Sequence, residues 1–268
     1  MLIFQYNIIV MKGKIGVAII TCNREHFLTQ CLDSIPIDKV DEICVINDGD
    51  RLSLDITDTY RRIFMIEHVK NLGVGKSKND AFKYLLSHDC DYIFILEDDV
   101  QILDKSIFNR YIEAHQASGI HHFNYGPGSP FNRKQTIQNF DIHNRHLLEG
   151  QTEPEPRMVL DYGNDVKVSL FTHAVGMFSF FTKEVLDKVG LIDEEYYNAW
   201  EHVDHTYRII KEGYHPPFWY FADIYNSHKY ITETEKSIDE SSIAKDNKQW
   251  QENVYKQREV YKKKHGHY

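Results

Sequence analysis

The stretch Tyr92-Ile-Phe-Ile-Leu-Glu-Asp-Asp-Val100 joins a strand signal directly to a cluster of acids. Residues 92–96 form an apolar run that suits a buried strand, and Glu97, Asp98 and Asp99 follow it without a break. Burying three unpaired carboxylates costs a large desolvation energy, so we expect them at the solvent-facing end of the strand or beside a cation. Hard oxygen ligands at a strand end suit Mg²⁺ or Mn²⁺, which bind through one or two carboxylates plus substrate phosphates. The alternative is a polar strand-to-helix turn in which Asp98 or Asp99 caps the helix.

Strand and helix signals alternate through the first half of the chain. Apolar runs at 15–20, 42–46 and 62–67 are typical of buried strands, and helical spacing follows at 25–35 and 76–88. This alternation predicts an α/β fold, a right-handed and mostly parallel sheet with helices on both faces.

Polar clusters follow three of these strands, at 21–24, 47–50 and 97–99. Ligands of parallel α/β sheets bind beyond the carboxyl ends of the strands. We therefore expect the three clusters to meet at one edge of the sheet and to form a single site.

The second half of the chain has a different character. Residues 119–165 are rich in His, Asn, Gly, Pro and charged residues, which predicts a long irregular or weakly stranded insertion. Beyond it the pattern predicts a strand at 171–181, a short helix at 183–189, a helix at 200–212, a strand at 218–223 and a charged, Lys-rich helix from about 238.

Composition limits the class of protein. The chain has 268 residues, 42% of them hydrophobic and 26% charged, which is ordinary for a soluble globular protein. Its net charge of −9 argues against a nucleic-acid binder that relies on phosphate neutralisation. Four cysteines without a CxxC pair indicate reduced, buried thiols and a cytoplasmic location; they are Cys22, Cys31, Cys44 and Cys90.

The apolar start of the chain does not predict a membrane anchor. Residues 1–10 are too short to span a bilayer, and they indicate an N-terminal extension or an added edge strand. No later stretch approaches ~18 uninterrupted apolar residues, so we expect at most peripheral contact with a membrane.

Five short motifs follow one another along the chain. They are VAIITCNRE at 17–25, VINDGD at 45–50, NLGVGKSKNDA at 71–81, ILEDDV at 95–100 and WEHVDHTYR at 200–208. With this order and spacing, from about residue 15 to 228, the chain resembles the nucleotide-sugar-dependent glycosyltransferases of the GT-A fold, especially family 2. The resemblance implies a GT-A sheet with an acceptor-side subregion and a C-terminal helix, and it places ILEDDV at the DXD position of the family.

The resemblance implies a nucleotide site at the carboxyl edge. Asp48 would accept a hydrogen bond from a base N–H, which suits uracil and also guanine; a turn Asp in Asp-Gly is the other interpretation. Residues at the first strand's end would line the nucleotide, and residues of the third motif would close over base and ribose. These are Thr21, Asn23 and Arg24, followed by Asn71, Gly73, Lys76 and Asn79.

The resemblance also implies a divalent cation, Mn²⁺ or Mg²⁺, that neutralises the diphosphate leaving group. Asp99 would be a metal ligand, with Glu97 and Asp98 contacting ribose or metal-bound water. His228 would be a second ligand, which Mn²⁺ tolerates better than Mg²⁺, although a lone His is more often structural.

The acceptor-side motif departs from the family pattern. Many inverting relatives carry Glu-Asp-x-Asp, and their second acid deprotonates the acceptor hydroxyl; here that position is His202. An imidazole can act as a general base near neutral pH. Glu201, His202 and Asp204 are the candidates for the base, in that order, and Arg208 would pair with Asp204 or contact a phosphate. Trp200 and its aromatic neighbours would form a sugar platform or pack in the core.

Taken together, these motifs predict a metal-dependent, inverting glycosyltransferase of the hexosyl or N-acetylhexosaminyl class. It would move a sugar from a nucleoside diphosphate, UDP before others, to a hydroxyl of a glycan or surface polysaccharide. A non-catalytic nucleotide- or sugar-binding protein is the alternative, and a nucleotidyltransferase would need a basic Gly-rich loop that is missing after the first strand. The predicted divisions are an extension at 1–10, a nucleotide-sugar half at 11–118, an acceptor half at 119–231 and a helical tail at 232–268.

Overall fold

The apolar runs form the centre of a six-stranded sheet. The computed structural model describes residues 13–133, 153–215, 219–234, 237–241 and 246–267, so the predicted extension at 1–10 lies outside the described residues. The strand order is β3-β2-β1-β4-β9-β6. Strands β3, β2, β1 and β4 are parallel, whereas β9 runs antiparallel to both of its neighbours. The bounds are β1 Ile15–Thr21, β2 Glu42–Asn47, β3 Phe64–Glu67, β4 Tyr92–Glu97, β6 His122–Tyr125 and β9 Val175–Thr182.

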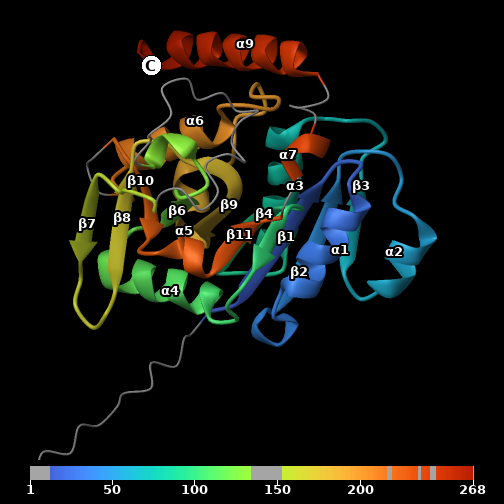
Figure 1. Cartoon of the computed structure of the whole chain (residues 1–268), viewed down its shortest axis with the longest axis horizontal. Coiled ribbons are helices and arrows are strands. Elements are labelled where there is room, and N and C mark those ends of the chain that lie inside the picture. Colours follow the sequence, from blue (N-terminus) through green and yellow to red (C-terminus); the bar gives the residue numbers. More distant parts are fainter. Residues whose placement is uncertain (1–12, 134–152, 216–218, 235–236, 242–245, 268) are drawn as a thin grey trace, which may run out of the picture.

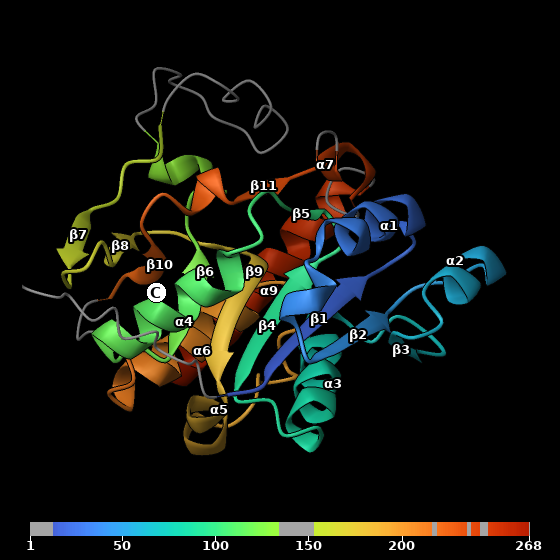
Figure 2. The same cartoon turned by 90° about the horizontal axis from the view of Figure 1, so that it is seen from below.

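Helices cover both faces of this sheet, as predicted (Figure 2). Alternate side chains of β1 enter two separate cores, because successive residues of a strand point to opposite faces. Val17 and Ile19 pack in the core shared with α1 (Glu25–Ser34) and α4 (Ile107–Ser118). The core on the other face contains residues of three other helices, which are α3 Val74–Ser87, α5 Lys183–Val189 and α6 Glu201–Lys211.

Smaller elements complete the described fold. A second sheet has the order β10-β8-β7, and a two-stranded sheet joins β11 to β5. The bounds are β5 Val100–Ile102, β7 Met158–Asp161, β8 Lys167–Phe171, β10 Phe221–Ile224, β11 Ile231–Glu233, α2 Leu54–Thr59 and α7 Ser237–Glu240, with 3₁₀ helices at Ile37–Lys39, Pro130–Asn132 and Ser227–Lys229.

Three sequence predictions about the second half need correction. The segment 119–165 is not an insertion throughout, because β6 completes the central sheet and β7 pairs in the second sheet, while 134–152 lie outside the described residues. The predicted strand at 171–181 is two strands, β8 and β9, in different sheets. The charged region from 238 is also divided, into α7 and the long helix α9 (Asn247–His265).

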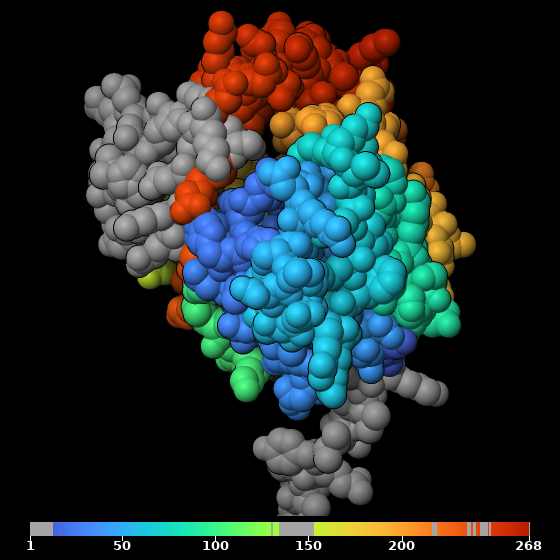
Figure 3. Space-filling view, turned by 90° about the vertical axis from the view of Figure 1, so that its right-hand side faces the viewer, coloured from blue at the N-terminus to red at the C-terminus, as the bar shows by residue number. Residues whose placement is uncertain are grey.

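The C-terminal helix α9 lies across one end of the molecule, beside α6 (Figure 1). In the space-filling view it forms a ridge at the top, above a face made largely by the first half of the chain (Figure 3). Its residue Tyr261 is buried, whereas most of its other side chains are exposed or half-buried. Among the described residues, no helix has both the length and the apolar character required to cross a bilayer.

The cysteines are free, and three of them are buried as predicted. Cys31, Cys44 and Cys90 lie in the two cores. Cys22 differs, because it follows β1 at the carboxyl edge of the sheet and is exposed.

Candidate functional site

The carboxyl ends of the central strands bring the three polar clusters together. Thr21, the last residue of β1, donates a hydrogen bond from Oγ1 to Asp98 Oδ2 over 2.7 Å. Asn23 accepts a hydrogen bond from the backbone N–H of Asp50, which follows β2. Segments far apart in the sequence therefore meet at one polar edge, as a parallel sheet requires.

Arg24 pairs with two of the acids at this edge. Its guanidinium bonds both oxygens of Asp98, and its Nη1 lies 3.1 Å from Asp99 Oδ2. Burial raises the pKa of Asp98 to about 7 although Arg24 opposes the shift, and the charge of Asp99 adds to it. Asp99 Oδ1 is buried and has no hydrogen-bond partner among the residues that the structure describes. The acids thus hold more negative charge than Arg24 alone neutralises.

A buried lysine joins this edge to α6, and sequence reasoning missed it. Lys78 of α3 lies 3.0 Å from Glu201 Oε1 and 3.8 Å from Glu97 Oε1, and it donates to the carbonyl of Gly176. Burial alone would lower the pKa of Lys78, but Glu201 and Glu97 raise it above its usual value. The one sequence signal was its place inside the NLGVGKSKNDA motif.

The same contacts shift the two glutamates in opposite directions. Burial would raise the pKa of Glu201, but Lys78 and then His202 hold it well below its usual range. Burial raises the pKa of Glu97, and Lys78 only partly opposes this, because Asp99 and Glu201 add negative charge. Glu201 is therefore a firmly ionised carboxylate, while Glu97 holds its charge less readily.

Asp48 is buried and fixes the loop that follows β3. Its carboxylate accepts hydrogen bonds from the backbone N–H groups of Leu72 and Gly73 over 2.7 and 2.8 Å, and it pairs with His68 Nδ1 at 2.6 Å. In this structure Asp48 thus holds the loop after β3 in place. Its predicted contact with a base stays a prediction.

The other residues of the third motif divide into two groups. Asn71 lies at the edge, where its amide reaches Cys22 Sγ and its oxygen accepts from Tyr197 Oη. Gly73 has a φ of +92°, and a Cβ there would lie 2.4 Å from the carbonyl oxygen of Tyr197, so this position requires glycine.

Lys76 and Asn79 contact protein groups instead. Lys76 pairs with Asp80, one turn along α3. Asn79 is buried and exchanges two hydrogen bonds with the backbone of Ile192. The structure thus gives Asn79 a packing contact, and its predicted role toward the nucleotide stays a prediction.

The acceptor-side candidates lie on the first turn of α6. Glu201 begins the helix, and His202 Nδ1 lies 3.3 Å from Glu201 Oε1. Asp204 is buried and accepts from Arg208 Nε, Tyr196 Oη and His265 Nε2. The predicted Arg208–Asp204 pair is confirmed at 2.9 Å.

The aromatic residues before α6 have separate surroundings. Trp200 has a φ of +68° and packs on Tyr261 of α9, with ring centroids 5.2 Å apart. Tyr196 is fully buried, and Tyr197 is partly exposed beside Asn71. Packing therefore accounts for Trp200 and Tyr196, and Tyr197 is the aromatic ring at the edge.

The residues present fit a divalent cation at Asp99. Its unpartnered, buried oxygen and the excess negative charge around it are what a hard cation neutralises. His228, the other predicted ligand, lies on the 3₁₀ helix Ser227–Lys229, with Nε2 3.0 Å from Glu153 Oε2. Within the described part of the chain, no three His, Cys, Asp or Glu side chains already gather as a metal cage. The metal role of His228 stays a prediction.

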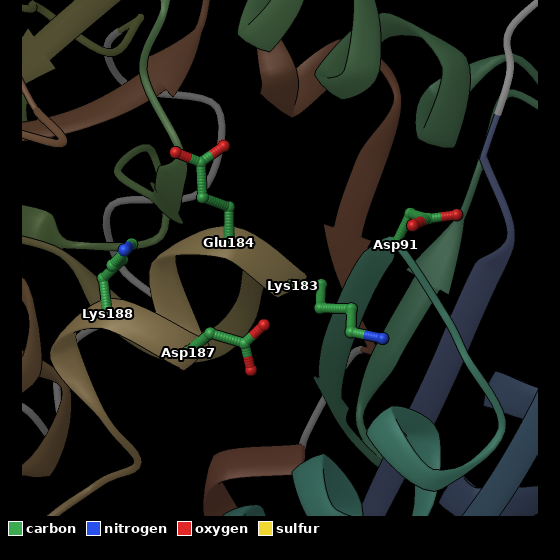
Figure 4. A pocket seen from close by; sticks show the side chains of 5 residues that line it. All are labelled: Asp91, Lys183, Glu184, Asp187 and Lys188. Atoms are coloured by element: carbon green, nitrogen blue, oxygen red, sulfur yellow. The ribbon is translucent and has the colours of Figure 1, made fainter.

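An open hollow of about 420 Å³ lies elsewhere, between the amino end of β4 and α5 (Figure 4). It is lined by Asp91, Lys183, Glu184, Asp187 and Lys188. Asp91 already accepts a hydrogen bond from the backbone of Lys14, and the lining mixes both charge signs. The hollow is at the opposite edge of the sheet from the acids, and we assign it no role in the chemistry.

Comparisons with known proteins agree with this geometry. The family model described as Glycosyl transferase family 2 matches residues 16–190, which end before α6. A protein of Acanthamoeba polyphaga mimivirus, described as an uncharacterized glycosyltransferase, is 26% identical over 265 residues and covers 93% of each chain.

Solved structures of TarS from S. aureus share the fold. The crystal structure of TarS 1–349 has a TM-score of 0.51 and 16% identity, over 83% of this chain and 61% of that one. Its complex with UDP has a TM-score of 0.53 and 15% identity, over 82% and 60%. The chain thus spans about three-fifths of these two TarS structures, and their likeness supports the GT-A arrangement of the sheet.

Proposed function

The chain belongs to glycosyl transferase family 2 with a GT-A fold, and on this premise we propose that it transfers a sugar from a nucleoside diphosphate to an acceptor hydroxyl with inversion. The observation that carries the proposal is the carboxyl edge itself. There Thr21, Arg24 and the acids Asp98 and Asp99 lie together, and Lys78 connects them to Glu201 on the acceptor side.

UDP is the nucleotide that we propose for the donor. Asn23 and Arg24 after β1, with Asn71 and Gly73 of the loop, form the nucleotide side of the edge. Asp48 fixes this loop and is the candidate acceptor for a base N–H. TarS, which shares the fold, has been solved with UDP.

Mn²⁺, or Mg²⁺ in its place, is the cofactor that we propose. Asp99 would hold it, with His228 as a second ligand, and a bound cation would neutralise the diphosphate that leaves. Arg24 lies beside the same acids, and it would bind a phosphate oxygen when a cation takes over the charge of Asp99.

The acceptor that we propose is a hydroxyl of a glycan or a surface polysaccharide. The residues that would activate this hydroxyl lie on the first turn of α6. Lys78 lies between this turn and the acids that follow β4, because its ammonium is close to both Glu201 and Glu97. A reaction by direct displacement needs a base on the acceptor side and charge stabilisation on the donor side, and the edge provides residues for both.

The first test is a thermal-shift panel of UDP, GDP and CDP with their common sugars, each with Mn²⁺ and with EDTA. A ligand that binds only the folded protein at 100 times its Kd raises the free energy of unfolding by about 2.7 kcal/mol. We expect stabilisation by UDP compounds that EDTA reverses. If no nucleotide changes the melting temperature, the proposed function is wrong.

Asp99→Asn tests the cation within the same panel. The free variant should melt close to the wild type, because the amide oxygen can still accept from Arg24 and the loss of the ion pair is offset by weaker repulsion with Asp98. Its Mn²⁺-dependent response to UDP should disappear. Asp187→Asn, which removes an exposed carboxylate at the opposite edge, is the matched control and should respond like the wild type. An unchanged Mn²⁺ response in Asp99→Asn would remove Asp99 from the metal site.

A further inference from the structure

The first turn of α6 holds three candidates for the base, and their contacts distinguish them. Asp204 has a 2% exposed side chain, and its two oxygens accept three hydrogen bonds from Tyr196, Arg208 and His265. Taking a proton there would break contacts that hold α6 to its neighbours. Asp204 is thus a structural carboxylate.

Glu201 is poorly suited to take a proton for a different reason. Its side chain is 4% exposed and lies 3.0 Å from the ammonium of Lys78, which is equally buried. This ammonium holds the pKa of Glu201 well below its usual range, against the effect of burial. The strength of a general base rises with its affinity for a proton, so a carboxylate held in this way is a weak base.

His202 has the geometry that Glu201 lacks. Its Nδ1 faces Glu201 Oε1 at 3.3 Å, and its side chain is 20% exposed, the most accessible of the three. An Nδ1–H that donates to the carboxylate leaves the Nε2 lone pair free to accept a proton. A carboxylate that orients an imidazole in this way is the arrangement used in catalytic triads.

We infer that His202 is the general base of the transfer, with Glu201 and Lys78 as positioning residues; this inference rests on the proposed function. Nε2 of His202 takes the proton of the acceptor hydroxyl while the hydroxyl oxygen bonds to the anomeric carbon. The bond from that carbon to the diphosphate oxygen breaks, and its electron pair leaves with the nucleoside diphosphate. The proton then passes from the imidazolium to water.

Charge balance in the cluster supports this assignment. The ammonium of Lys78 lies near two carboxylates, Glu201 at 3.0 Å and Glu97 at 3.8 Å, so Glu201 does not have this cation to itself. An imidazolium on His202 would place a second positive charge beside Glu201. The ring of Phe221 lies 6.3 Å from that of His202. Burial holds the pKa of His122, a histidine that the charge of His202 reaches, well below its usual value, so His122 stays neutral.

The histidine–glutamate contact can be measured without a donor. In the full chain with ¹⁵N-labelled histidine, we expect His202 to show the Nδ1–H tautomer, with its signal identified by its loss in His202→Gln. Glu201→Gln should lower the share of the Nδ1–H tautomer, because this N–H loses the carboxylate that accepts from it. Glu195→Gln removes an exposed carboxylate that pairs with Lys264 and should leave the signal unchanged. A His202 signal that ignores Glu201→Gln would overturn the inference.

Turnover gives the second readout, measured as release of UDP from UDP-sugars with water in the place of the acceptor. His202→Gln should lower kcat by about 10²- to 10⁴-fold while the affinity for UDP with Mn²⁺ stays within about two-fold. His202→Asp, which restores an acid at this position, should recover part of the rate. If His202→Gln turns over as fast as the wild type, His202 is not the base. If the wild-type protein does not bind UDP at all, the proposed function is wrong instead.

Discussion

At the scale of single residues, Lys78 and Glu201 form a buried ion pair. Both side chains are 4% exposed and their charged atoms lie 3.0 Å apart. Removing one partner of such a pair leaves an unpaired buried charge, which costs about 3–5 kcal/mol. We expect Lys78→Met to lose that much stability in urea denaturation at pH 7.

The pH dependence of this variant provides the check. In the wild type the pKa of Glu201 is lower in the folded state than in the unfolded state, so acidification through the ordinary carboxyl range weakens the fold. Without Lys78, burial raises the folded pKa above the unfolded one, and the sign reverses. Lys78→Met should be more stable at pH 5 than at pH 7, and Lys78→Met with Glu201→Gln should recover most of the loss. Equal stability of the single variant at both pH values would contradict the pairing.

Sequence reasoning found the acids of this site but not their partners. Glu97, Asp98 and Asp99 follow an apolar strand, and that local pattern alone places them at the sheet edge. Lys78 can be buried because it pairs with Glu201, which lies 123 positions later in the sequence. A local sequence pattern cannot predict a contact between residues so far apart. Asp204 was missed as a packing residue for the same reason, since its partner His265 is in the last helix.

At the scale of elements, Asp223 of β10 ties the second sheet to the central one. It is fully buried and accepts four hydrogen bonds, from Tyr111 Oη, the backbone of Gly126 and of Ile224, and Ser227 Oγ. These partners belong to α4, the loop after β6, β10 itself and the 3₁₀ helix that carries His228. One carboxylate thus positions the element that presents a predicted metal ligand.

Asp223→Asn is the test of this role. An amide turns an N–H donor toward at least one of the four donors, and each buried group left unsatisfied costs about 1–3 kcal/mol. We expect lower stability in chemical denaturation and a smaller Mn²⁺-dependent response to UDP. Tyr111→Phe removes one donor but keeps the carboxylate, so it should cost about 1 kcal/mol and spare the Mn²⁺ response. If Asp223→Asn unfolds like the wild type, the carboxylate does not hold these elements together.

Hydrophobic periodicity correctly predicted the strands and helices whose apolar residues recur without interruption along the element. Strands β1, β2 and β4 and helices α1, α3 and α5 match their predicted ranges closely. Strand β6 was missed, because its sequence His122-Phe-Asn-Tyr125 is short and half polar. The side chains of His122 and Asn124 are buried in the sheet, and both form a hydrogen bond with Thr206 of α6. This partner is close to them only in the folded chain.

At the scale of the whole molecule, α9 joins the C-terminus to the acceptor side of the site. Tyr261 is 4% exposed and packs on Trp200, the residue just before Glu201. His265 of the same helix bonds Asp204 over 2.7 Å, and Gln257 accepts a hydrogen bond from the backbone of Tyr197. The last helix therefore fixes the segment that places Glu201 and His202.

This connection predicts a long-range effect on transfer. Tyr261→Ala leaves a cavity under α9 and should cost about 3 kcal/mol. Hydrogen exchange should become faster in α6 and in residues 196–200. The turnover of UDP-sugars should fall by a larger factor than the affinity for UDP, because the residues proposed to bind the donor keep their own contacts. Tyr255→Ala, on the same helix with a 64% exposed ring, is the matched control and should leave both unchanged. Wild-type exchange in α6 of Tyr261→Ala would show that the first turn of α6 is held without α9, and the orientation of His202 would then depend on Glu201 and Lys78 alone.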